Sequence, residues 1–122
     1  MNISNSFPVI QNCILYGNSL RQLFISDKAS FTKLINCNIQ DGMAGIAFGS
    51  SVTEFNGTYE NNLAIDPYFV SPPAGAGSGH DALQADWALT DSSDCINAGN
   101  NTLAGTPLPS GDIAGNIRLK YG

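Results

Sequence analysis

The sequence predicts an all-β solenoid of about three to four coils, in which short parallel strands stack from one coil to the next. The main observation is an internal repeat. Ile10-Gln11-Asn12-Cys13-Ile14-Leu15 can be laid over Leu34-Ile35-Asn36-Cys37-Asn38-Ile39 with a spacing of 24 residues, and Glu54-Phe55-Asn56-Gly57-Thr58-Tyr59 matches more loosely, 20 residues further on. A repeat of this length is typical of solenoids, in which each coil buries its apolar face against its neighbours.

The composition supports the same fold class. The chain has 122 residues, which suits one domain, and its 13 Gly and 6 Pro predict short strands and many turns. Only 12% of the residues are charged, and the net charge is -5. The few Lys and Arg residues are scattered, which argues against binding to nucleic acid. No apolar run reaches the roughly 18 residues that a membrane span requires.

Within residues 1–62 we expect each coil to carry a strand, a polar corner and at least one further strand. The corners are Gly17-Asn18, Asp41-Gly42 and Asn61-Asn62. The segments Leu20–Ile25 and Gly45–Phe48, which lie between the aligned copies, are the further strands. Each strand would pair in parallel with its equivalent one coil away. Residues 63–122 are predicted to form one or two irregular coils and a C-terminal cap of the same domain.

The repeat predicts a structural ladder of Asn12, Asn36 and Asn56, with Cys13 and Cys37 beside it. Asn tolerates the left-handed backbone of a sharp bend, and stacked amides can bond from coil to coil. The alternative is three unrelated turn residues.

The cysteine count leaves two alternatives open. Adjacent coils would place the Cα atoms of Cys13 and Cys37 about 4.8 Å apart, which permits a disulfide. The other interpretation is a pair of buried thiols that act as small apolar residues. The third cysteine, Cys95, makes the number odd, so the redox state of the three stays open.

Four motifs in the second half carry a resemblance to a known kind of protein. They are Asn62–Val70, Asp86–Leu89, Cys95–Asn100 and Asp112–Arg118. Their order and spacing resemble the C-terminal segment of secreted or surface proteins of the right-handed parallel β-helix, or pectin-lyase-like, fold, of the choice-of-anchor type. The resemblance implies a right-handed parallel β-helix with an irregular C-terminal cap.

The resemblance also implies a location. It implies a fragment of a larger protein at the cell surface or outside the cell, with the export signal and the anchor on sequence not present in this chain. An exposed coil end would allow self-association through unpaired strand edges.

The first functional hypothesis is enzymatic, because β-helix proteins include polysaccharide lyases and glycoside hydrolases. Hydrolases use two or three carboxylates within about 5 to 10 Å. The repeat region offers acidic residues, but no two share an aligned column. We therefore expect no catalytic residue in this chain. The alternative is a fragment of such an enzyme whose active coils lie upstream.

The second hypothesis is calcium binding. Oxygen ligands for Ca²⁺ could come from acidic residues that lie close together in sequence. The candidates are Asp81, Asp86, Asp91 and Asp94. The alternative is a solvated acidic loop, and no other cofactor is expected.

The third hypothesis is a non-catalytic module that contacts polysaccharide. Aromatic ring faces suit the C–H faces of sugar rings. The candidates for this contact are Tyr16, Tyr59, Tyr68 and Trp87. The alternative is that they fill the core or the cap. We take this module as the expected function, with polysaccharide as its partner.

Overall fold

The computed structural model describes residues 1–75, 79–80, 82–103, 106–107 and 109–111 of the chain. The described part is built of short strands and two 3₁₀ turns, with no α-helix, so the all-β prediction is confirmed. No helix in these ranges has the length and apolar character that crossing a bilayer requires.

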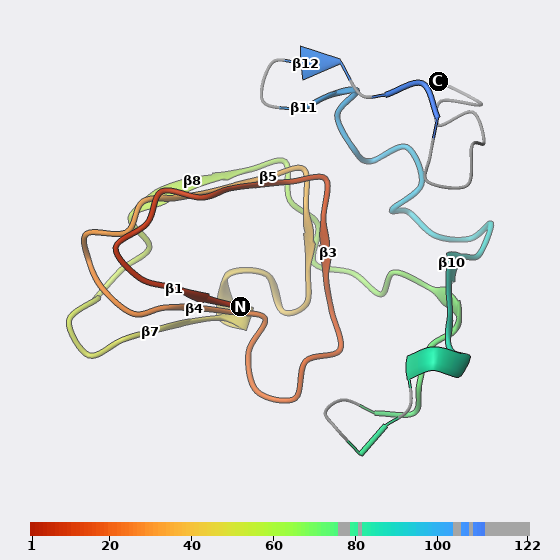
Figure 1. The fold of residues 1–122 in the computed structure, drawn as a ribbon, viewed down its shortest axis with the longest axis horizontal. Helices are drawn as coiled ribbons and strands as arrows, with labels where there is room; N and C mark the ends of the chain where they lie inside the picture. Colours follow the sequence, from red (N-terminus) through yellow and green to blue (C-terminus); the bar gives the residue numbers. More distant parts are fainter. Residues whose placement is uncertain (76–78, 81, 104–105, 108, 112–122) are drawn as a thin grey trace.

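The first 63 residues make three successive passes through parallel sheets. One sheet has the order β1-β4-β7, a second has β2-β5-β8, and a third pairs β3 with β6. The bounds are β1 Asn2–Ile3, β2 Val9–Gln11, β3 Ile14–Leu15, β4 Leu23–Ile25, β5 Thr32–Ile35, β6 Asn38–Ile39, β7 Ile46–Phe48 and β8 Gly57–Glu60. All pairings in these sheets are parallel, as predicted. Figure 1 shows β1, β4 and β7 along one side of the passes and β5 and β8 along another.

The core lies between these sheets. Leu34 is fully buried at the centre of β5, where the register places it between Ile10 of β2 and Tyr59 of β8. Burial alternates along β4 and β5, as it must where one face of each strand points inward. The interior of the passes is therefore packed with side chains from equivalent positions.

The bend after the second sheet is made by asparagine in every pass. Asn12, Asn36 and Asn61 all adopt the left-handed backbone, with φ of 55°, 53° and 52°. Few side chains other than Asn tolerate this conformation, because the Cβ atom crowds the following carbonyl. The physical reason given for the asparagine column therefore holds for Asn12 and Asn36.

The third member of the column was predicted wrongly. Thr32 pairs with Gly57 and Ile35 with Glu60, so Asn61 follows the strand where Asn36 does, and Asn56 precedes it. The reason is a longer loop. Residues 26–31 join β4 to β5, whereas residues 49–56 join β7 to β8, so the third pass is shifted relative to an alignment by residue type.

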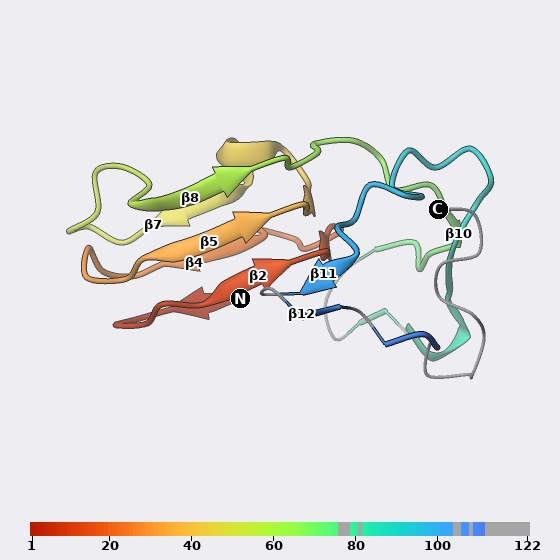
Figure 2. The same ribbon diagram turned by 90° about the horizontal axis from the view of Figure 1, so that it is seen from above.

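The described part of the second half forms two small antiparallel pairs. Strand β9 (Phe69–Ser71) pairs with β10 (Asp86–Leu89), and β11 (Thr102–Leu103) pairs with β12 (Thr106–Pro107). Figure 2 shows this half beside the passes, which lie one next to another in the order β2, β5, β8. The motif at residues 112–118 lies outside the described residues.

Side chains at the asparagine bend hold the second half in place. Asn38 Nδ2 donates to the carbonyl of Ile65 at 3.0 Å and to Cys95 Sγ at 3.1 Å. Asn12 Nδ2 donates to the carbonyl of Asn100 at 2.7 Å, and the Asn100 N–H donates back to Asn12 Oδ1 at 2.8 Å. These hydrogen bonds run along the side of the passes, whereas the expected cap lay over the end of the last one.

Candidate functional site

The largest cavity lies where the first pass meets the second half. Its volume is about 570 Å³, within the range of roughly 300–1,000 Å³ that small-ligand pockets occupy. The loop after β3 forms one wall, and the segments around β9 and β10 form the others. Its lining residues are Tyr16, Gly17, Asn18, Asp66, Tyr68, Phe69, Pro72, Pro73, Ala74, Gly75, His80 and Trp87.

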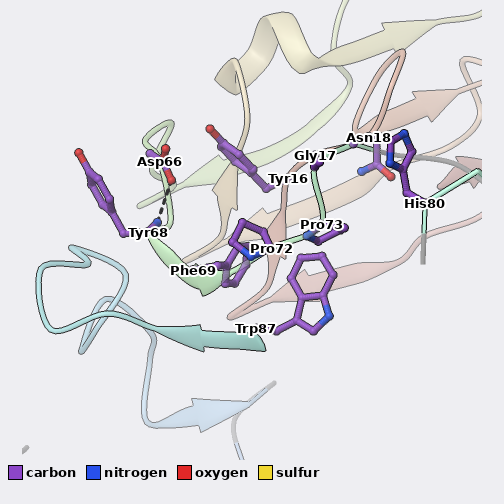
Figure 3. Close-up of a pocket in the computed structure, with 12 residues that line it drawn as sticks. Tyr16, Gly17, Asn18, Asp66, Tyr68, Phe69, Pro72, Pro73, His80 and Trp87 are labelled. Atoms are coloured by element: carbon purple, nitrogen blue, oxygen red, sulfur yellow. Dashed lines mark hydrogen bonds between the residues drawn. The ribbon is translucent and has the colours of Figure 1, made fainter. Parts of the chain in front are cut away.

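Three of the four aromatic candidates line this cavity. Tyr16 follows β3, Tyr68 precedes β9, and Trp87 lies in β10, so residues far apart in sequence meet here. Tyr68 and Trp87 keep 53% and 49% of their surfaces exposed, which leaves both rings available to a ligand. Trp87 is fixed by an edge-to-face contact with Phe69, with ring centroids 5.2 Å apart. We refer to this cavity below as the aromatic pocket (Figure 3).

The backbone at Tyr68 is strained. Its φ of 51° lies in the left-handed region, which is unfavourable for a bulky residue and costs on the order of 1–3 kcal/mol. Asp66 Oδ1 accepts the Tyr68 N–H at 2.8 Å and holds the turn in this form. The exposed ring of Tyr68 gains little from packing that would offset the strain. Strain of this kind is characteristic of functional sites.

Asp66 and Tyr16 supply polar groups beside the rings. Figure 3 shows Asp66 between the side chains of Tyr68 and Tyr16. Partial loss of solvent raises the pKa of the Tyr16 hydroxyl, and the negative charge of Asp66 raises it further. Tyr16 is therefore a neutral phenol at physiological pH, able to donate one hydrogen bond and accept another.

The fourth aromatic candidate, Tyr59, has a different place. Its ring packs against the core and makes an edge-to-face contact with Phe55, with centroids 6.3 Å apart. Burial raises the pKa of its hydroxyl. Because Tyr59 lies on the opposite strand from Leu34, it follows the alternative in which an aromatic residue fills the core.

The sequence did not single out the polar and proline lining of the pocket. Asp66 was recognised only as part of an Asp-Pro turn. The turn itself, an Asp-Pro step followed directly by an aromatic residue, is the one local signal that could have pointed to this site.

The predicted ladder residues line a smaller cavity of about 230 Å³. Asn12, Asn36, Cys13, Cys37 and also Cys95 border it. Asn36 Nδ2 donates to the carbonyl of Ala98 at 3.4 Å, so the amides of Asn12 and Asn36 bond to the crossing segment rather than to each other. Asn56 is not among the lining residues. In the third pass Asn62 takes the position after the bend, and its Oδ1 accepts the Cys37 N–H at 2.8 Å.

All three cysteines are free thiols in the structure. Cys13 and Cys37 are neighbours on adjacent strands, because Ile14 pairs with Asn38 in parallel register. The Cys37 thiol lowers the pKa of Cys13 to about 6, against the opposing effect of burial. The same interaction, together with burial, raises the pKa of Cys37. Cys13 is thus the reactive thiol of the pair.

The acidic candidates do not come together as a metal site in the described residues. No three His, Cys, Asp or Glu side chains in this part of the chain are placed to hold a metal ion. Asp86 Oδ1 accepts the N–H of Ala88 at 2.9 Å, which is a local turn contact, and Asp91 and Asp94 are exposed. Asp81 lies outside the described residues.

Comparison with protein-family models, with curated proteins and with solved structures found no match for this chain. The function must therefore be argued from the residues and the geometry of the aromatic pocket.

Proposed function

We propose that this chain is the non-catalytic, C-terminal part of a secreted or cell-surface right-handed parallel β-helix protein, and that its aromatic pocket contacts polysaccharide. The β-helix assignment is supported by three passes that visit parallel sheets in the same order, with an asparagine bend at the same point of each. The location outside the cell rests on the resemblance of the C-terminal motifs.

One observation carries the functional proposal: the convergence of Tyr16, Tyr68 and Trp87 on one open pocket. A sugar ring has apolar C–H faces and a rim of hydroxyl groups. Aromatic rings with a polar tip offer matching apolar area, and Tyr16 and Asp66 offer partners for the rim. A soluble protein gains nothing in stability from holding such rings half exposed, so a binding role explains their arrangement.

The pocket has the equipment of a binding site rather than of a hydrolase. Among its lining residues in the described part of the chain, Asp66 is the one carboxylate, whereas a glycoside hydrolase needs a pair about 5 to 10 Å apart. The enzymatic alternative therefore needs catalytic residues in further coils of a longer protein. Aligned acidic and basic residues in such coils would favour it.

The test is a glycan array followed by calorimetric titration of each captured glycan. We expect Trp87→Ala to weaken binding by at least about tenfold, since it removes the largest ring of the pocket. The control is Phe7→Ala, which removes a ring that is 72% exposed and lies outside the pocket. Absence of any captured glycan, or equal affinities of the two variants, contradicts the proposal.

Tyr68 allows a second test that separates binding from folding. Asn tolerates the left-handed backbone better than Tyr, so Tyr68→Asn should leave the urea midpoint equal or higher. The same substitution removes a ring of the pocket and should weaken glycan binding severalfold. Lower stability with unchanged binding would show that Tyr68 serves the fold instead.

A further inference from the structure

The polar groups of the aromatic pocket share one property: they accept hydrogen bonds. Asp66 carries a carboxylate, which has about four acceptor positions, and the Tyr68 N–H uses one of them. Asn18 Nδ2 donates to Gln22 Oε1 at 2.6 Å, which leaves the Asn18 amide oxygen as its acceptor toward the pocket's contents. The neutral Tyr16 hydroxyl adds one more acceptor and a single donor.

The charge of the pocket points in the same direction. No Lys or Arg is among the lining residues that the structure describes. Asp66 contributes a negative charge, and the whole chain carries a net charge of -5. A ligand carboxylate would meet no cation here and would be repelled by Asp66. A sugar hydroxyl, in contrast, can donate to the same oxygen.

We propose that the aromatic pocket selects uncharged glycan chains and rejects polyuronates, with Asp66 as the residue that makes the distinction. This inference rests on the proposed function and deepens it. The rings of Tyr16, Tyr68 and Trp87 provide affinity for any sugar face. Asp66 accepts from hydroxyl groups of a neutral sugar and repels the carboxylate that a uronic acid carries on its ring.

The sharpest comparison uses ligands that differ only in charge. Oligogalacturonate hexamers and their carboxyl methyl esters are titrated into the protein, together with neutral gluco-, manno- and xylo-oligosaccharides. For any scaffold that binds, we expect the uncharged form to bind at least about fivefold more tightly than the acid, because like charges about 4 Å apart in water cost about that factor. Added salt should narrow the difference by screening the repulsion.

Asp66→Asn tests the assigned residue. The amide oxygen can still accept the Tyr68 N–H, so the turn is kept, while the charge is removed. The affinity for the acid should then rise to within about twofold of the ester. Glu54→Gln is the matched control, because it changes the net charge equally on an exposed residue outside the pocket, and it should leave the preference unchanged.

The outcomes separate the two proposals. If acid and ester bind equally to the wild-type protein and Trp87→Ala weakens both, the pocket binds sugar but the charge selection is wrong. Acid binding tighter than ester binding overturns the inference as well. If no oligosaccharide binds in a way that depends on Trp87, the proposed function fails and the inference fails with it.

Discussion

The two halves of the chain divide the work of folding and of binding. The buried hydrophobic residues of the described structure all lie between Ile3 and Ile46, within the three passes. Beyond residue 66, Pro67 and Ser93 are buried, while Tyr68, Val70 and Trp87 are exposed. The comparison teaches that the registered strands form a stable frame, and that the second half uses this frame to present side chains.

The link between the halves is polar. Asn12, Asn36 and Asn38 reach from the bends of the first two passes to backbone carbonyls of the second half. The same residue type therefore serves both regions: its backbone makes the bend, and its amide binds the crossing segment. The pocket depends on this link, because Tyr16 belongs to one half and Trp87 to the other.

The largest effect is expected from a cavity in the first half. Leu34→Ala should lower the free energy of unfolding by about 2–5 kcal/mol, since Leu34 is fully buried between Ile10 and Tyr59. Val70→Ala, at a position in β9 that is 53% exposed, should cost less than about 1 kcal/mol. Urea unfolding checks both values. Equal losses would break the comparison between a packed frame and a lightly packed second half.

A smaller effect is expected where the halves are joined. Asn38 is 4% exposed, and Asn38→Leu would leave the buried N–H and carbonyl of Ile65 without the side-chain partners they have now. We expect a loss of about 1–3 kcal/mol, with faster hydrogen exchange at Ile65.

The control for this link is Asn56→Leu, at an exposed position. It should change the free energy of unfolding by less than about 0.5 kcal/mol. If the two variants are equally stable, the polar link does not hold the second half in place.

The smallest effect concerns reactivity rather than stability. Because the pKa of Cys13 is lowered to about 6, its alkylation by iodoacetamide should rise through pH 6 and level off above about pH 7. Cys37→Ala removes the interaction that stabilises the thiolate, so the midpoint should move to higher pH, while Cys37→Ser retains a donor and should keep it low. A midpoint near pH 8.5 in the wild-type protein would contradict this assignment.

Much of the first half could be predicted from sequence, because equivalent residues recur there. The copies at residues 10–15 and 34–39 pair with each other in the predicted register. The third copy failed because loop length is free to vary where strands are fixed. Residue-type matching chose Asn56, while the longer loop before β8 moved the bend to Asn61.

The pocket could be predicted only in part. Tyr16, Tyr68 and Trp87 were identified by type, since exposed aromatic residues in a turn-rich chain point to ligand contact. Asp66 was missed, because its role depends on a turn that brings it beside Tyr16, and no periodic pattern records such a meeting. Tyr59 was misassigned with the shifted third copy, which concealed its place opposite Leu34.

The most direct test of the account uses Trp87, the single tryptophan of the chain, as a reporter within the pocket. A neutral oligosaccharide captured on the array is titrated while the indole N–H resonance and the tryptophan fluorescence are followed. The account predicts a saturable change in both signals with the affinity found by calorimetry. A glycan that binds while both Trp87 signals stay constant would place the binding site elsewhere and contradict it.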